Sequence, residues 1–593
     1  MSTDELTKVA TEAASGGLFL FIGNASSTVI LAVGAIIVAR LLGPFSYGLY
    51  TLTVAIPLLL VALADAGMNF ALVRLPARLR SEGDHARADR LVRLGFLLKL
   101  AISTAASIVC YAGSTVIASI VLNRPELTPF VQLASLMILF QAIYDATNNI
   151  FIGQDLMHYS ASIQILQATL KGALAPAFVL FGLGITGAIW GYVLALAAAG
   201  LTGAALLFTR HVRSSGRTTS PASTELHALL GYGLPLYAAA ILSVFLTQYQ
   251  NIVLAHFASN VEIGNFGATW AFTTFMMILT YPITTAIFPM FSKMNPKDQR
   301  GDLARGFVLA VKYTSLLMIP ASVAVMVFSR DLIYLTYGKA YALAPQYLVI
   351  LAALYLLTAI SYLVMGSFLS GIADTRTVLK ISVVTLGFYL PLGPILAWLW
   401  GPYGLFIAYI LSNATATVYG LRQTSVKHDA RPDLRAGGRI LVTALTAAVP
   451  VVAVIQLHPT GVGIVNLLFG GLLYLVACLT LAPVLGAVDK FDLMNLRTIL
   501  EFVISRRYRE LEIRVVAFTR LGQNRLDQNV LEIMTLDGNA LDLTLIRRQV
   551  DVEEIDRDKL VVRAYVIVTR MLAEIVDSIF DYEAKLLSIM SRD

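Results

Sequence analysis

The segment LGFLLKLAISTAASIVCYAGSTVIASIVL, residues 94–122, decides the fold, because Lys99 is its only charged residue. A helix of this length rises by about 43 Å, which exceeds the roughly 30 Å of hydrocarbon in a bilayer. A charge inside hydrocarbon costs at least about 2.5 kcal/mol. The segment therefore predicts a membrane-spanning helix whose lysine faces the interior of a helical bundle. A similar phrase, GFVLAVKYTS (306–315), places Lys312 in a second apolar segment.

The composition of the whole chain agrees with a polytopic membrane protein. Of its 593 residues, 57% are hydrophobic and 14% are charged, whereas soluble domains carry about 25% charged residues. The net charge of +7 does not indicate a nucleic-acid partner, because most basic residues lie in short loops between apolar segments. Cys110 and Cys478 lie in apolar segments, which argues against a disulfide framework or a cysteine metal site. We expect neither a metal nor a cofactor.

The apolar segments predict an all-α protein with about fourteen transmembrane helices. The first apolar run follows a terminus that lacks a basic region, so it is interpreted as a span and not as a cleaved signal. The predicted spans are 15–41, 49–74, 94–122, 127–153, 161–183, 185–208, 232–256, 263–291, 304–328, 342–370, 378–400, 402–421, 438–457 and 460–485.

The placement of basic residues predicts the orientation of these spans. About twenty Lys and Arg residues lie in the loops on one side, and the other side holds only Arg40, Arg124, Arg330 and Lys339. Because basic loops stay in the cytoplasm, we expect both termini to be cytoplasmic in a multi-pass protein of the plasma membrane.

The chain also repeats itself at a nearly constant offset. GLGITGAIWGYVLAL (182–196) is similar to LWGPYGLFIAYILSN (399–413), and Gly48 aligns with Gly264 as Lys99 does with Lys312. Six spans in each half make this a parallel repeat. The predicted domains are two pseudo-symmetric six-helix lobes, residues 1–208 and 209–421, followed by two extra spans in 422–488.

Residues 489–593 are too polar to span a membrane. The stretch 509–566 alternates apolar and polar residues and has a turn at 537–539, whereas 567–590 has the pattern of an amphipathic helix. This predicts a small cytosolic α+β region. It contains no catalytic motif, and its role, including the docking of glycan-assembly enzymes, stays open.

The segment VARLLGPFSYGLYTLTVAIPLLLVALADAGMNFALVR, residues 38–74, carries a family pattern: RLLGP, then YGLY, a proline within the span, D-x-G, and an arginine. It resembles the polysaccharide-biosynthesis flippases of the multidrug/oligosaccharidyl-lipid/polysaccharide exporter superfamily, and DYEAKLL near the end resembles the tail of archaeal members. The resemblance covers residues 10–490. It implies fourteen helices, two lobes, and alternating-access export of a lipid-linked oligosaccharide without covalent chemistry.

Polar residues within the spans are the candidate substrate-binding residues. A lysine can follow a phosphate on its flexible stem, and amides suit sugar hydroxyls. The candidates are Lys99, Lys312, Lys171, Asp65, Asp145, Arg74, Asn148, Asn149, Gln141, Gln248, Gln250 and Asn251, with Arg40, Pro57 and Lys380 as gate or structural residues.

Alternatives stay open for these side chains. Lys99 and Lys312 either line a cavity, form structural ion pairs or extend towards the cytoplasm. Asp65 is the candidate partner of Lys99, and Asp145 that of Lys171.

Three functions compete. The first is a flippase that moves a polyprenyl-(pyro)phosphate-linked oligosaccharide from the cytoplasmic to the outer leaflet, with this lipid and the membrane lipids as its partners. The second is a cation-coupled multidrug antiporter; its family places an acid in the first span, where this chain has only Asn24. The third is a membrane glycosyltransferase or polymerase, which short outer loops disfavour. The sequence identifies neither the glycan nor the coupling ion.

Overall fold

The computed structural model describes residues 3–211, 222–292, 300–457, 463–489 and 492. Most of the predicted α+β region, residues 489–593, lies outside the described residues. Contacts divide the chain into two units, residues 1–477 and 478–593. Every contact discussed below lies within the first unit.

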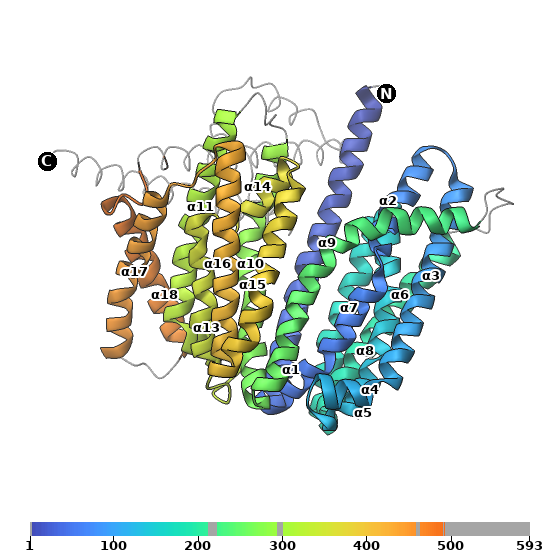
Figure 1. Ribbon diagram of the computed structural model, residues 1–593, viewed down its shortest axis with the longest axis horizontal. Helices are drawn as coiled ribbons and strands as arrows, with labels where there is room; N and C mark the ends of the chain where they lie inside the picture. The colour runs from blue at the N-terminus through green and yellow to red at the C-terminus, as the bar shows by residue number, and fades with distance from the viewer. Residues whose placement is uncertain (1–2, 212–221, 293–299, 458–462, 490–491, 493–593) are drawn as a thin grey trace, which may run out of the picture. The chain divides into compact units, whose positions relative to one another are not determined.

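The described part of the chain is helical throughout (Figure 1). One-turn π-helical segments (Ile117–Val121, Val179–Leu183, Leu207–His211) and 3-10 segments (Pro125–Leu127, Leu354–Ile360) interrupt longer helices. The α-helices are α1 (Thr3–Asp65), α2 (Met68–Ser81), α3 (His85–Ala112), α4 (Ser114–Val116), α5 (Thr128–Ala134), α6 (Leu136–Gly153), α7 (Met157–Phe178), α8 (Gly184–Leu206), α9 (Ala222–Phe257), α10 (Asn260–Ser292), α11 (Arg300–Val327), α12 (Ser329–Thr336), α13 (Ala344–Ala353), α14 (Met365–Gly371), α15 (Thr375–Trp400), α16 (Pro402–His428), α17 (Leu434–Leu457) and α18 (Gly463–Val484).

Within the described residues, nine helices are long and apolar enough to cross a membrane, or ten if the bent pair Ala344–Ile360 and Met365–Gly371 is one span. Some of them exceed one crossing. Helix α1 has 63 residues, so it is about 95 Å long, and its backbone leaves the helical region at Gly43 (φ 70°, ψ 168°). This break separates the first two predicted spans. A multi-pass helical membrane protein is thereby established, and the count of fourteen stays a prediction.

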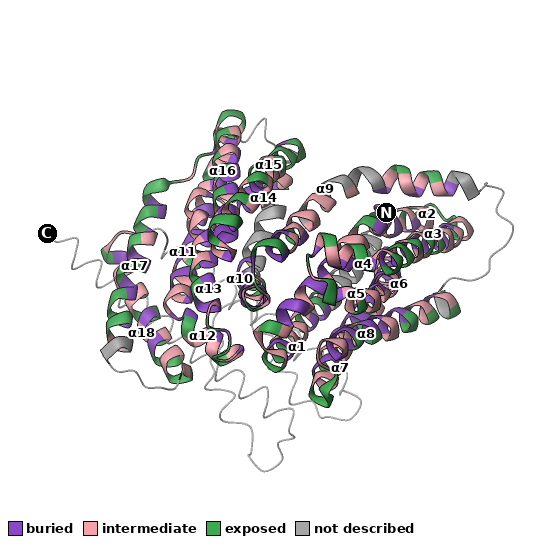
Figure 2. Ribbon diagram, turned by 60° about the horizontal axis from the view of Figure 1, so that its bottom comes forward, coloured by how far each residue is buried: buried purple, intermediate pink, exposed green. Residues whose placement is uncertain are grey.

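Large apolar side chains cover the outer faces of many helices, as Figure 2 shows by the many exposed positions. Phe181 is 81% exposed, Trp398 72% and Leu468 71%. Water-soluble proteins rarely expose such side chains in continuous patches. These faces therefore suit contact with lipid chains.

The sequence repeat has a counterpart in backbone conformation. Gly184 and Gly401, which lie at the starts of α8 and α16, have nearly the same dihedral angles (φ 52°, ψ −132° and φ 58°, ψ −140°). Asp155 and Ala373, in the turns before α7 and α15, both have positive φ, 59° and 61°. The two halves of the chain thus share local geometry at aligned positions, including two where a side chain makes that geometry unfavourable.

Two backbone contacts join α1 and the α1–α2 turn to the second half of the chain. A Cβ atom on Gly48 would lie 2.0 Å from the carbonyl oxygen of Asn260, and one on Gly264 would lie 1.9 Å from that of Pro44. The other contact joins Gly67 and Gly233, where an added Cβ would lie 2.2 Å or 2.5 Å from the opposite carbonyl oxygen. Only glycine permits such approaches.

The apolar packing differs between the two contacts. Around Gly48, Leu52 belongs to one buried cluster with Leu254 and Phe266 of the second half. Around Gly67, the buried cluster contains helices of the first half and Leu229 from the beginning of α9. Near Gly67, therefore, the second half of the chain contributes to the buried cluster through the beginning of α9.

Candidate substrate-binding site

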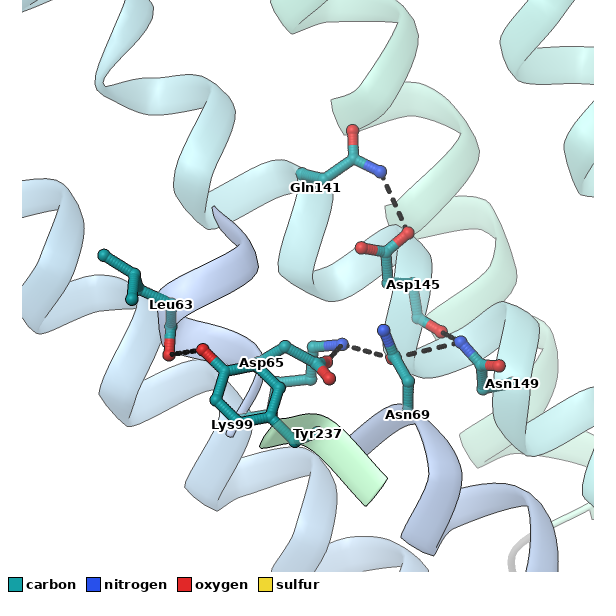
Figure 3. A network of polar contacts seen from close by, with 8 residues as sticks. All are labelled: Leu63, Asp65, Asn69, Lys99, Gln141, Asp145, Asn149 and Tyr237. Atoms are coloured by element: carbon teal, nitrogen blue, oxygen red, sulfur yellow. Dashed lines mark hydrogen bonds and ion pairs between the residues drawn. The ribbon is translucent and has the colours of Figure 1, made fainter. Parts of the chain in front are cut away.

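A polar network centred on Lys99 lies inside the first half of the chain (Figure 3). The Lys99 ammonium on α3 donates to Asp65 Oδ1 at 2.8 Å and also to Asn69 Oδ1. The Lys99 side chain is 3% exposed and that of Asp65 13%. Positive φ angles at Ala66 (46°) and Gly67 (79°) interrupt the helix between α1 and α2. This turn brings Asp65 and Asn69 to the same lysine.

Helix α6 extends this network through residues spaced four apart. Such residues share one helix face. Asn149 Nδ2 donates to Asn69 Oδ1 at 3.0 Å and to the backbone oxygen of Asp145 at 2.7 Å. Gln141 Nε2 donates to Asp145 Oδ1 at 2.9 Å. The structure thus brings together five predicted site residues and adds Asn69, which the sequence analysis missed although it stands four residues after Asp65.

Lys171, on α7, has a different kind of partner. Its Nζ lies 3.3 Å from the centre of the Tyr192 ring on α8. Among the described residues, no carboxylate lies within the 4.0 Å of an ion pair with this ammonium. The carboxylate of Asp145, proposed as its neutralising partner, instead accepts from Gln141. A cation–π contact of this kind contributes about 0.5–2 kcal/mol.

Several other predicted residues lie outside the network of Figure 3. Asn148 Oδ1 accepts from Ser160 at 2.7 Å and from Gln164 at 3.2 Å, which ties α6 to α7. Gln248 accepts from Asn251 at 3.2 Å within α9. The remaining candidates there are Gln250, buried on α9, and Lys312, half-buried on α11.

The predicted gate residues are dispersed. Arg40 donates to the backbone oxygen of Leu335 at 3.3 Å, so it links α1 to α12. Arg74, a candidate substrate-binding residue and not a predicted gate residue, donates to the Tyr232 hydroxyl at 2.9 Å. Pro57 is buried within α1, and Lys380 is exposed on α15.

Two known families match parts of this sequence. Residues 13–295 match the polysaccharide biosynthesis protein family, and residues 235–395 match the MatE family. A relative from Haloferax volcanii, named probable low-salt glycan biosynthesis flippase Agl15, is 23% identical over 303 residues. That match covers 48% of this chain and 64% of the relative, so the chain spans less than two thirds of the relative's length.

Solved structures share the fold. The lipid II flippase MurJ, in an inward closed conformation, superposes with a TM-score of 0.64 at 14% identity, over 79% of this chain and 99% of that one. An inward-facing multidrug resistance MATE family transporter of the MOP superfamily gives 0.59 at 18% identity, over 69% and 98%. At these identities the likeness concerns the fold alone.

The described helices define the class as a multi-span helical membrane protein. More particularly, residues 13–295 are similar to the polysaccharide biosynthesis protein family and residues 235–395 to the MatE family. The resemblance carried by residues 38–74 is thereby confirmed.

Proposed function

We propose that this protein is a flippase that moves a polyprenyl-(pyro)phosphate-linked oligosaccharide from the cytoplasmic to the outer leaflet by alternating access. The family match and the relative named as a glycan biosynthesis flippase support this function. The protein is a transporter and not an enzyme in this proposal, because moving a lipid between leaflets breaks no covalent bond.

The contact of Lys171 with Tyr192 is the observation that carries the proposal. An ammonium inside hydrocarbon must be solvated by something, and here that partner is an aromatic ring. A phosphate is a stronger partner for an ammonium than a ring, because the hydrogen bonds are charge-assisted. A substrate phosphate therefore displaces Tyr192 from Lys171. A cationic drug offers no such exchange, since it repels the lysine.

Lys99 has another role in this proposal. Its ammonium already donates to Asp65 and Asn69, so the pair fixes the α1–α2 turn and holds the amides of α6 in place. A contact of Lys99 with the substrate phosphate requires its ammonium to leave Asp65, so Lys171 takes this role in the proposal. Lys312 remains a proposed second contact from the other half.

The predicted lobes and the predicted orientation in the membrane are also part of this proposal. Two six-helix lobes, 1–208 and 209–421, move about the substrate, and residues 422–488 supply two further spans. Both termini face the cytoplasm of a plasma-membrane protein, where residues 489–593 are available to glycan-assembly enzymes.

A multidrug antiporter is the second candidate. The MatE match over residues 235–395 favours it. Its family's acidic residue is absent from the first span, 15–41, which contains Asn24 and no Asp or Glu.

Flipping of a fluorescent polyprenyl-pyrophosphate-linked oligosaccharide in proteoliposomes tests the function. We expect the wild type to flip the lipid, Lys171→Met to lose at least about tenfold in rate, and Lys171→Arg to retain part of it. Lys339→Met is the matched control, because that lysine is exposed in the turn after α12. Drug export without lipid flipping by the wild type would reject the proposal in favour of the antiporter.

A further inference from the structure

Helix α9 begins ten residues before its predicted span. We call residues 222–233 the arm. Leu229 of the arm is fully buried in the cluster that contains Leu72 and Phe96, and Leu226 and Leu230 pack against the same cluster. Figures 1 and 2 show α9 as a long curved helix whose beginning lies beside α2 and α3. The arm therefore belongs to the packing of the first half, although it is continuous with the second.

Two arginines hold the arm in this position. Arg87 Nε donates to Glu225 Oε1 at 2.7 Å, and Arg74 donates to the Tyr232 hydroxyl at 2.9 Å with its guanidinium 5.0 Å from the ring centre. Glu225 and Tyr232 are seven residues apart, so they lie on one face of α9 about 10 Å from each other. Both arginines thus line the same face of the arm.

The ion pair is asymmetric in its exposure. The side chain of Glu225 is 0% exposed, whereas that of Arg87 is 37% exposed. The hydrogen bond and the charge of Glu225 raise the pKa of Arg87. Because a buried carboxylate depends on its cation, loss of the contact between Arg87 and Glu225 weakens the docking of the arm. The guanidinium, in contrast, remains accessible to an anion from outside.

A sequence with two glycines and a proline, GYGLP (residues 231–235), separates the arm from the span within α9. Proline has no N–H to complete the helix, and Gly/Pro sites are common places for a helix to bend. A Cβ on Gly231 would meet nothing within 4 Å. The arm can therefore swing about this point while the span stays in place.

The arm also covers the polar network. Gly233 contacts Gly67 through the backbone, two residues after Asp65. Tyr237, the next turn of α9, donates to the backbone oxygen of Leu63 at 3.2 Å and lies beside Lys99 and Asp65 in Figure 3. Undocking of the arm therefore removes its packing around Leu229, whereas Tyr237 stays with the span.

We propose that Arg87 forms a docking site for a lipid phosphate, that the Glu225 carboxylate occupies this site in the present state, and that a phosphate which replaces the carboxylate releases the arm. Arginine suits this exchange because its planar fork binds carboxylate and phosphate oxygens in the same geometry. The identity of the lipid as a polyprenyl phosphate rests on the proposed function. The exchange itself rests on the contacts of the arm.

Hydrogen–deuterium exchange of the full chain in nanodiscs tests the proposal, with residues 222–233 as the reporter. We expect polyprenyl phosphate to speed exchange in the arm at least about tenfold, and neutral polyprenol to leave it unchanged. Glu225→Gln should exchange fast without ligand and respond no further. The double variant Arg87→Glu with Glu225→Arg should restore slow exchange, because the pair is re-formed in the opposite sense. Arg78→Gln is the matched control, since the Arg78–Glu82 pair lies within the α2 turn and its side chains are 71% and 49% exposed.

Each measurement supports or rejects one part of the proposal. Slow exchange in Glu225→Gln would reject the carboxylate as the lock. Fast exchange in Glu225→Gln, with no effect of polyprenyl phosphate on the wild type, would reject the phosphate site. An equal effect of polyprenol would reject it as well. An equal effect of inorganic phosphate supports the exchange and places recognition in the phosphate alone. The flipping assay judges the proposed function separately, because it does not depend on movement of residues 222–233.

Discussion

Replacement of Lys99 by methionine tests whether its buried ammonium acts as a structural partner of Asp65 or as a contact for the substrate phosphate. Methionine keeps the length of the side chain and removes the charge. In the structure this leaves the Asp65 carboxylate, 13% exposed, without the ammonium at 2.8 Å, and removes a donor to Asn69. Loss of one partner of a buried ion pair costs about 3–5 kcal/mol.

A second substitution gives the size of the pair's own contribution. The double variant Lys99→Met with Asp65→Leu removes both charges, and replacement of a buried pair by apolar residues is often neutral. We therefore expect the double variant to recover most of the stability that the single variant loses. A difference of 3 kcal/mol is a factor of about 10² in the unfolding equilibrium, which thermal or denaturant unfolding in detergent resolves readily.

Transport by the double variant then distinguishes the roles. A stable double variant that still flips lipid assigns Lys99 to structure, as the hydrogen bonds indicate. A stable double variant that no longer flips lipid returns Lys99 to the phosphate site. If Lys99→Met unfolds no more easily than the exposed control Lys339→Met, the ammonium is not buried with Asp65, and the reasoning from the network is refuted.

Three further predictions concern other contacts. Tyr192→Phe should preserve flipping, since the ring that faces Lys171 remains, whereas Tyr192→Leu should destabilise the protein by about 0.5–2 kcal/mol; unfolding midpoints check both. Gly67→Ala should destabilise by about 1–3 kcal/mol, because its Cβ would lie 2.2 Å from the Gly233 oxygen, and Gly231→Ala, which meets nothing within 4 Å, is the control; equal stability would contradict the contact. Partial burial raises the pKa of Asp374, but hydrogen bonds from Thr377 and Lys427 outweigh it and lower the pKa to about 2. Because the folded pKa is below the ordinary 3.8, this carboxylate stabilises the fold fully above that pH and loses its effect towards pH 2. The difference in unfolding temperature between wild type and Asp374→Asn should shrink over this range.

The sequence predicted the class of fold because apolar segments as long and as numerous as these fit membrane-spanning helices and not a water-soluble protein. A run such as 94–122 cannot be placed in water, and the pattern of 38–74 lies within residues 13–295, which match the polysaccharide biosynthesis protein family. Its candidates included Gln141, Asp145 and Asn149, whose spacing of four residues places them on one helix face.

The contacts between helices could not be predicted from the sequence. Nothing in the order of residues shows that Lys171 meets Tyr192 and not Asp145, because that choice depends on how α7 and α8 pack. Asn69 was missed since its role depends on the turn at Ala66 and Gly67. The arm of α9 was also missed, because the predicted span began at residue 232 and excluded Glu225.

The contact of Gly67 with Gly233 limits which substitutions this protein can accept in evolution. A clash between two side chains can be relieved by a smaller residue on the partner, so one change can follow the other. Here both partners are already the smallest residue, and the atoms that would collide are carbonyl oxygens. A genetic screen for suppressors of Gly67→Ala should therefore find no second-site substitution at position 233. Any revertant must move an entire helix.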